Sequence, residues 1–351
     1  MSNVRIGDIC QVFDGPHATP TKITEGPVYL GIDAITEDGR LNPAEYNHLS
    51  EADYKIWTKR VTPQKNDIVF SYEATLGRYA MIPDGFYGCL GRRLAIVRAK
   101  DDRVNPKWLY YYFLSPEWKV FVANHTVKGS TVDRISVEDF PGYPIPLPKR
   151  NEQDDVVEVL SRIDARIDTN TCICNELEAM AKTLYDYWFT QFDFPDAEGK
   201  PYRFSGGEMN WNDQLKREIP KGWTVGQLSD IANITMGQSP AGKTYNENGY
   251  GTIFYQGCTD FGTRFPEPRV YTTAPTRYAK VGDILMSVRA PVGTLNIAME
   301  DCCIGRGLAA LNSKVGSQLY LWYTLAGFKQ LFNVLDGNGT TFGSVTKDTL
   351  Y

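Results

Sequence analysis

The longest regular pattern in the chain is a run of apolar residues spaced alternately four and three positions apart. It lies between Asn151 and Phe192, in a stretch that contains neither glycine nor proline. Such spacing is typical of a heptad helix, and at the α-helical rise it would be roughly 60 Å long. We expect Asn151 to cap this helix, and the helix to act as a spacer that packs against another helix. The helix seam comprises Val156, Leu160, Ile163, Ile167, Asn170, Cys174, Leu177, Ala181, Leu184 and Trp188.

On the two sides of this helix, the chain repeats itself with a period near 210–216 residues. A period of this length indicates a duplicated domain rather than a solenoid. The matching blocks, in the same order, are Lys65–Gly77 with Val281–Gly293, Cys89–Ala95 with Cys303–Ala309, Trp108–Leu114 with Leu319–Leu325, and Gly129–Thr131 with Gly339–Thr341.

Each copy of the repeat mixes strand and helix signals. The short apolar segments at 67–71 and 283–287 are followed by turns that end in glycine, which predicts strands. The aromatic blocks at 108–114 and 319–325 predict helices, whereas the Gly-Ser-Thr and Gly-Thr-Thr segments predict exposed loops.

The predicted fold class is α+β, with two tandem homologous mixed α/β domains joined by the long heptad helix. We place domain 1 at 1–148, the helix at 149–192, a polar connector at 193–222 and domain 2 at 223–351.

Charge is unevenly distributed along the 351 residues, whose formal net charge is −5. Residues 1–148 carry 17 basic and 18 acidic side chains, and residues 222–351 carry 10 and 9. The helix and connector, with 10 and 15, therefore hold the excess acidity. Each near-neutral domain can present a basic face to a partner such as nucleic acid.

The chain lacks the features of a secreted or membrane protein. No apolar run approaches a membrane span, and the N-terminus carries no apolar signal core, so we expect a cytoplasmic protein. The seven cysteines are odd in number and lack zinc-ligand spacing, which predicts unbridged, mostly buried thiols and no metal site.

Three motifs imitate catalytic sites without their usual context. Residues 237–244 match the phosphate-loop pattern, but a poor helix start follows them. Residues 195–200 imitate a nuclease carboxylate–lysine set within one polar connector. Residues 42–46 resemble the Asn-Pro-Pro-Tyr tetrapeptide of amino-methyltransferases but lack its second proline. We predict no catalytic residues in this chain.

Basic and hydroxyl residues of the repeated blocks are instead candidates for DNA contacts. Arginine can bind guanine edges, and serine, threonine and arginine can bind phosphates, although any one of these residues can equally be a solvated surface group. The candidates are Arg78, Arg92, Arg93, Lys128, Ser130, Thr131, Arg134, Arg289 and Arg306.

The order of these features resembles the DNA-specificity (S) subunit of Type I restriction–modification systems over essentially the whole chain. The segments at 14–20 and 237–240 are similar to the opening loops of that family's target recognition domains. The segment at 146–189 is similar to its central conserved region, and 192–207 to the usual continuation. The resemblance adds the candidate DNA contacts His17, Thr19, Tyr72, Gln238, Ser239, Lys243, Asn338, Thr340 and Thr341.

The resemblance implies a subunit that is not itself catalytic. Each recognition domain would read one half of a bipartite double-stranded DNA site, and the helix would fix the spacing of the halves. The same helix would dock methyltransferase (M) subunits, which bind S-adenosylmethionine and methylate adenine N6. A motor–nuclease (R) subunit that uses ATP and Mg would join for cleavage. No cofactor is expected in this chain.

One departure from the family pattern affects the helix. The family normally carries a second conserved helix after the second recognition domain, packed antiparallel on the first, and the chain stops before its equivalent. We therefore expect the helix seam to lack a partner in this chain and to pair with a second copy or with an M subunit.

Two other classes of function compete with this interpretation. One is a coiled-coil scaffold whose domains bind something other than DNA. The other is an enzyme, either a phosphate-loop nucleotidase or a fused methyltransferase–nuclease.

Overall fold

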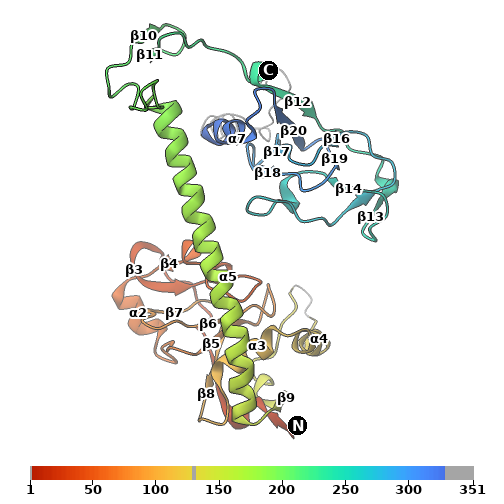
Figure 1. The fold of residues 1–351 in the computed structure, drawn as a ribbon. Coiled ribbons are helices and arrows are strands. Elements are labelled where there is room, and N and C mark those ends of the chain that lie inside the picture. The colour runs from red at the N-terminus through yellow and green to blue at the C-terminus, as the bar shows by residue number, and fades with distance from the viewer. Residues whose placement is uncertain (1, 129–131, 329–351) are drawn as a thin grey trace. The chain divides into compact units, whose positions relative to one another are not determined.

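The structure is a computed structural model that describes residues 2–128 and 132–328. It divides into two compact units, residues 1–172 (unit 1) and residues 173–351 (unit 2). One helix, α5 (Arg150–Tyr185), continues from the first unit into the second, and a π-helical turn at Asp186–Thr190 ends it (Figure 1). The predicted long helix is thus confirmed.

The start of α5 differs from the prediction. Asn151 lies inside the helix, and the backbone N–H of Lys149 is instead accepted by the Glu152 carboxylate at 2.9 Å. The acidic residue in the first turn therefore satisfies a backbone amide that immediately precedes the helix.

Unit 1 contains a four-stranded antiparallel sheet and a three-stranded mixed sheet. Within the mixed sheet, β3 and β7 run parallel. The four-stranded order is β2 (Cys10–Asp14), β8 (Leu94–Ala99), β5 (Ile68–Ser71), β6 (Tyr79–Met81), and the three-stranded order is β4 (Asn47–His48), β3 (Ile23–Leu30), β7 (Gly88–Leu90). The strand predicted at 67–71 is confirmed as β5.

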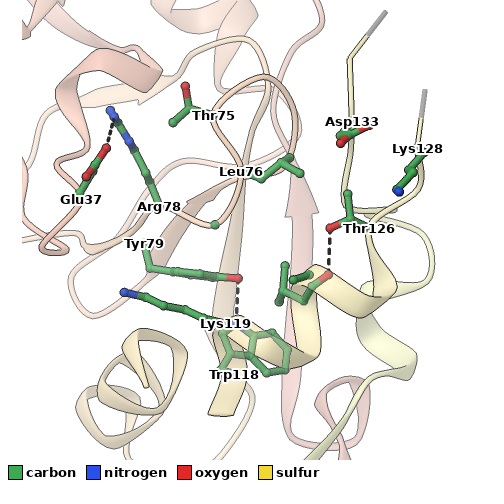
Figure 2. Close-up of a pocket in the computed structure, with 13 residues that line it drawn as sticks. Glu37, Thr75, Leu76, Arg78, Tyr79, Trp118, Lys119, Thr126, Lys128 and Asp133 are labelled. Carbon is green, nitrogen blue, oxygen red and sulfur yellow. Dashed lines mark hydrogen bonds and ion pairs between the residues drawn. The ribbon is translucent and has the colours of Figure 1, made fainter. Parts of the chain in front are cut away.

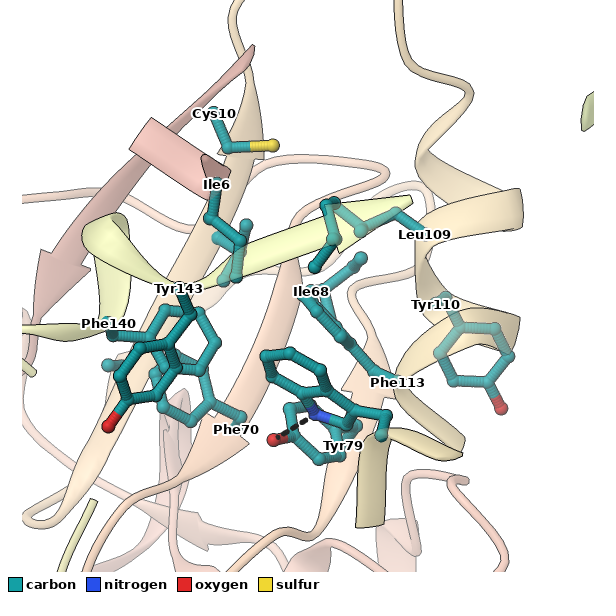
Figure 3. Close-up of a cluster of buried hydrophobic side chains, with 14 of the residues drawn as sticks. Ile6, Cys10, Ile68, Phe70, Tyr79, Leu109, Tyr110, Phe113, Phe140 and Tyr143 are labelled. Carbon is teal, nitrogen blue, oxygen red and sulfur yellow. Dashed lines mark hydrogen bonds between the residues drawn. The ribbon is translucent and has the colours of Figure 1, made fainter. Parts of the chain in front are cut away.

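The described residues of unit 1 also contain four short α-helices, and two of them, α3 (Pro106–Leu114) and α4 (Pro116–His125), contribute aromatic side chains to its core. The rings of Phe70, Phe113 and Phe140 lie in one buried cluster (Figure 3). Trp118 belongs to the same cluster, and its indole N–H donates to the Tyr79 hydroxyl at 2.8 Å. The other two helices are α1 (Ile6–Ile9) and α2 (Glu51–Trp57), and a further strand pair joins β1 (Ser2–Arg5) to β9 (Pro144–Leu147). The helix predicted at 108–114 is confirmed as α3.

Unit 2 repeats this plan. A four-stranded antiparallel sheet has the order β12 (Ala232–Met236), β20 (Leu308–Ser313), β17 (Ile284–Ser287), β18 (Leu295–Ile297). A five-stranded sheet has the order β13 (Tyr245–Asn246), β15 (Tyr271–Thr272), β14 (Thr252–Tyr255), β19 (Cys302–Ile304), β16 (Tyr278–Ala279). The helices are α6 (Leu228–Ile231) and α7 (Gln318–Gly327). The second predicted strand and helix are thus β17 and α7.

The shared topology makes the duplication visible in three dimensions. In both four-stranded sheets, the strand that comes first in the sequence pairs with the strand that comes last, and the two intermediate strands follow. The orders are β2-β8-β5-β6 and β12-β20-β17-β18. In both units a parallel pair joins the second sheet, β3 with β7 and β14 with β19. The prediction of two homologous mixed domains is therefore confirmed.

The connector between α5 and unit 2's sheets is more ordered than a polar linker. It contains a hairpin of β10 (Met209–Asn212) and β11 (Arg217–Pro220). Its aromatic residue Phe194 stacks on both Tyr202 and Trp223, with ring centroids 4.8 and 5.3 Å apart. Aromatic stacking thus orders the segment that was predicted only as a polar connector.

All seven cysteines are free, and four of them, Cys10, Cys89, Cys302 and Cys303, are buried. Burial raises the pKa of the Cys10, Cys89 and Cys302 thiols to about 12. The prediction of unbridged, mostly buried thiols is confirmed. In the described part of the chain, no helix combines the length and the apolar character needed to cross a bilayer.

Candidate nucleic-acid interface

In unit 1 the candidate site is built around a short turn between β7 and β8. We call Gly91–Arg93 the Gly-Arg turn. The Gly91 N–H donates to the Leu30 carbonyl at 2.7 Å, and a Cβ at this position would lie only 2.2 Å from that oxygen. Only glycine fits there. The next residue, Arg92, is exposed, and its backbone N–H donates to the Tyr29 hydroxyl at 3.1 Å.

Unit 2 has the same arrangement at its own Gly-Arg turn, Gly305–Gly307. The Gly305 N–H donates to the Tyr255 carbonyl at 2.8 Å. The backbone N–H of Arg306 donates to the Ser239 hydroxyl at 3.2 Å, and the Arg306 side chain is exposed. In each unit a hydroxyl from another segment, strand β3 in unit 1 and the loop after β12 in unit 2, thus fixes the backbone beneath an exposed arginine.

A second loop lies beside each Gly-Arg turn. It is the turn that follows β5 in unit 1 and the turn that follows β17 in unit 2. In unit 1 the Tyr72 N–H donates to the Arg93 carbonyl at 3.1 Å, and in unit 2 the Val288 N–H donates to the Gly307 carbonyl at 2.9 Å. These bonds bring Glu73 beside Arg93, with an ion-pair distance of 3.4 Å. Arg93 is therefore ion-paired within the chain, and its role as a DNA contact stays a prediction.

In unit 2 three predicted residues lie around one polar pocket of about 400 Å³. Ser239 comes from the opening loop, Arg289 from the turn after β17, and Arg306 from the Gly-Arg turn. The repeat had suggested these loops separately, and the fold brings them together.

The sequence reasoning missed other residues of this pocket. Arg269 also lines it and pairs with Asp260 at 2.8 Å and with Glu247 at 3.6 Å. These residues lie outside the repeated blocks, so the comparison of the two copies carried no signal for them.

A second pocket, of about 480 Å³, lies in unit 1 and contains two predicted residues, Arg78 and Lys128 (Figure 2). The Arg78 guanidinium donates to the Ile35 carbonyl at 3.0 Å and pairs with Glu37 at 3.3 Å. It is held by its own chain, and its role as a DNA contact stays a prediction. Lys119 of α4, which the sequence reasoning missed, lines the same pocket.

The remaining candidates differ in exposure. Tyr72 is 6% exposed, and burial, together with the nearby Asp14 carboxylate, raises the pKa of its hydroxyl. It is a core residue in this structure, and its role as a DNA contact stays a prediction. His17 is exposed and pairs with Asp14 at 2.9 Å. Further exposed candidates are Thr19, Arg134, Gln238 and Lys243. Ser130, Thr131, Asn338, Thr340 and Thr341, and with them both predicted glycine loops, lie outside the described residues.

Comparison with known proteins identifies this architecture. Residues 1–179 and 220–351 match the family model described as the Type I restriction modification DNA specificity domain. The chain belongs to this DNA specificity family. The match covers segments from both units, as the internal repeat requires.

Several members of the specificity family are similar in sequence. The chain is 32% identical over 295 residues to the MjaX type I restriction enzyme specificity subunit of Methanocaldococcus jannaschii, which covers 81% of this chain and 66% of that protein. It is 31% identical over 255 residues to the MjaIX specificity subunit of the same organism, with coverage of 70% and 54%. The chain therefore spans between about a half and two thirds of these relatives.

A solved structure aligns with nearly the whole chain. The HsdS subunit of Thermoanaerobacter tengcongensis is 25% identical, with 99% of this chain and 82% of that chain covered and a TM-score of 0.35.

The residues of the phosphate-loop pattern lie within the second segment that matches the specificity domain. Residues 237–244 end in a 3-10 turn at Gly242–Thr244, which strand β13 follows directly. A phosphate-binding loop instead opens an α-helix whose first amides bind the anion. Gly237 approaches the Gly305 carbonyl so closely that a Cβ would lie 2.1 Å from it. The lack of a side chain at Gly237 therefore allows its backbone to pack against the Gly-Arg turn.

The specificity family's long helix shows two different faces here. In unit 1 it packs through Gln153 and Val157, and in unit 2 through Ala181 and Tyr185. Ala181 thus has a partner in the chain, which contradicts the expectation of a wholly unpartnered seam. An apolar stripe on another side of α5 is 43–65% exposed and comprises Val156, Val159, Ile163, Ile167, Ile173, Leu177, Met180 and Leu184.

The exposed stripe is rotated relative to the predicted seam. Val156, Ile163, Ile167, Leu177 and Leu184 belong to both. The other stripe members, Val159, Ile173 and Met180, each fall one position before a seam member.

Proposed function

We propose that this chain is the DNA sequence-specificity subunit of a Type I restriction–modification complex, and that each unit reads one half of a bipartite site. One observation carries the proposal. Each unit of this specificity-family chain holds an exposed arginine, Arg92 or Arg306, on a glycine-anchored turn whose backbone is fixed by a hydroxyl. Such a side chain can reach a groove or a phosphate while its base stays rigid.

We propose further that the spacer role belongs to α5. A continuous helix of 36 residues extends about 54 Å at the α-helical rise. Because one turn of B-DNA is about 34–36 Å long, a rigid helix of this length can hold two readers about one to one and a half turns apart. The spacing of the two half-sites would then follow from the helix, while the intervening bases need no contact.

The partners in this proposal are double-stranded DNA, methyltransferase subunits and a motor–nuclease subunit. The exposed apolar stripe on α5 supports docking of an M subunit or a second copy, since exposed stripes of this kind usually mark interfaces. The chemistry would belong to the partners, with S-adenosylmethionine in the M subunit and ATP with Mg in the R subunit. This chain would supply recognition only, as a cytoplasmic protein.

A binding experiment tests the central claim. The full chain, alone and with its M subunit, is titrated against duplex DNA at 50–300 mM salt. Because phosphate contacts release counterions, we expect affinity to fall steeply with salt. Binding that is absent under both conditions would contradict the proposal and favour the coiled-coil scaffold.

Methylation mapping tests the two-reader arrangement. In a host that expresses the complex, we expect N6-methyladenine within a bipartite motif. The Arg92→Ala variant should weaken or relax the half read by unit 1 and leave the other half unchanged. Arg92 is preferred to Arg93 because only Arg92 is free of an ion pair among the described residues. Equal relaxation of both halves would contradict the assignment of one half to each unit.

A further inference from the structure

Equivalent positions of the two units carry different charges at the candidate interface. The turn that follows β5 in unit 1 carries Glu73, and the equivalent turn that follows β17 in unit 2 carries Arg289. The last residue of the Gly-Arg turn is Arg93 in unit 1 and Gly307 in unit 2. Only the middle arginine, Arg92 or Arg306, is common to both. The fold is duplicated, but the electrostatics of its two copies are not.

In unit 1 the charges of the two differing residues, Arg93 and Glu73, compensate each other. The Arg93 guanidinium and the Glu73 carboxylate are 3.4 Å apart, and both side chains are about a third exposed, at 31% and 30%. Arg93 also has a positive φ of 70°, a backbone conformation that fixes where its side chain leaves the turn. One net cation, Arg92, remains.

In unit 2 the differing residues add charge instead. Arg289 and Arg306 both line the 400 Å³ pocket, and within the described ranges neither has a carboxylate at ion-pairing distance. The pocket's own carboxylate, Asp260, is bonded to Arg269 at 2.8 Å. Two uncompensated guanidinium groups therefore face one polar hollow.

The rest of the lining suits a phosphate better than a base edge. Ser239 and Thr259 bring hydroxyls, and Gly257 and Gly307 leave the backbone open to close approach. A guanine-reading arginine needs its guanidinium fixed in one plane for two parallel hydrogen bonds. Among the described residues no carboxylate orients Arg289 or Arg306, so they can act as mobile cations around phosphate oxygens.

We propose that the pocket formed by Ser239, Arg289 and Arg306 binds a phosphate of the DNA backbone, and that the described residues of unit 1 form no equivalent phosphate clamp. This inference rests on the proposed function. As a consequence, unit 2 supplies a larger share of the salt-dependent DNA affinity than unit 1 does.

The test compares the salt dependence of variants of the full chain, assembled with its M subunit and titrated against a random-sequence duplex. In R289A/R306A we expect affinity at 50 mM salt to fall about tenfold and the log–log salt slope to become shallower by about 1 to 2, because each phosphate contact adds about 0.9 to the slope. R289K/R306K should keep the slope, since a lysine is an adequate point charge for phosphate.

The matched control removes the equivalent residues of unit 1. E73A/R93A deletes a neutral pair, so its slope should equal that of the unmodified chain. Because Arg289 and Arg306 are exposed, their variants should melt at the unmodified temperature, and a circular dichroism melt verifies this.

Three results would overturn the pocket's role. The first is an unchanged slope in R289A/R306A. The second is an equal change of slope in E73A/R93A. The third is a loss of discrimination between duplexes at constant slope, which would make these arginines base readers. In all three the unmodified chain still binds DNA, so the proposed function survives. If the unmodified chain binds no duplex at all, the proposed function and the pocket both fail.

Discussion

At the scale of single residues, the duplication preserves a buried aspartate but changes its partner. Asp67 is 1% exposed and accepts two hydrogen bonds from the Arg98 guanidinium, both at 2.7 Å. Its equivalent Asp283 is 8% exposed and accepts one from the Asn312 amide at 3.0 Å. A buried carboxylate needs compensation, and the two units provide it with a cation and with a neutral amide.

This difference predicts unequal costs of removing the partner. Arg98→Ala leaves a buried charge unpaired and should destabilise unit 1 by about 3 kcal/mol. Asn312→Ala removes one neutral hydrogen bond and should cost unit 2 about 1 kcal/mol. Urea unfolding followed by tryptophan fluorescence measures both.

The double variant D67N/R98M serves as the control, because it removes charge and cation together and should recover most of the Arg98→Ala loss. Equal costs for the two alanine variants would show that the ion pair at Asp67 is not the source of the difference.

Which arginines are available for DNA could be predicted only in part. The repeat pointed to the turns that carry Arg92, Arg289 and Arg306, and these three side chains are exposed in the structure. It could not show that Glu73 would meet Arg93, because that contact depends on two loops joined by hydrogen bonds across the fold. Likewise Arg269 enters the unit 2 pocket from a segment without a repeated counterpart.

At the scale of elements, one buried amide fixes the start of α5 to unit 1. The Gln153 side chain is fully buried, and its oxygen accepts the Asn105 N–H at 2.7 Å. Its NH₂ group donates to the carbonyls of Arg103 and Pro148 at 3.0 and 2.9 Å. All three partners are backbone groups that would otherwise be unsatisfied in a dry environment.

Gln153→Leu should therefore destabilise unit 1 by about 3 kcal/mol, since it leaves these buried groups without partners. Hydrogen exchange of the Asn105 amide gives a local measurement, and we expect its protection to fall with the global stability. The neighbouring exposed residue supplies the control, because Asn151→Ala should change stability by less than about 0.5 kcal/mol. A large effect of Asn151→Ala would restore that residue as the helix cap.

The heptad spacing was sufficient to predict the helix but not its orientation. Any stretch of this length without glycine or proline and with apolar residues at three and four spacing is helical. The side that contacts a domain was not determined by that spacing, because Gln153, a polar residue, anchors the helix and Ala181 packs inward. The exposed stripe consists of apolar residues of α5 that, among the residues the structure describes, do not pack into the hydrophobic core of either unit.

At the scale of the whole molecule, the exposed stripe on α5 sets the expected association. Ile163 is 49% exposed and Leu177 is 58% exposed, and they are two heptads apart on the same side of the helix. An apolar stripe of this length is costly in water, so we expect it to be covered by an M subunit or by a second copy of the chain.

Placing charges on the stripe should prevent that association. I163E/L177E should weaken binding to the M subunit and any self-association at least tenfold, because two carboxylates would be buried without partners. Light scattering of the chain alone and with the M subunit measures both. Ala165→Glu is the matched control, since Ala165 is exposed on α5 outside the stripe and should have no effect. An unmodified chain that remains a monomer and binds no M subunit would remove the stripe's proposed role, and so would a double variant that assembles normally.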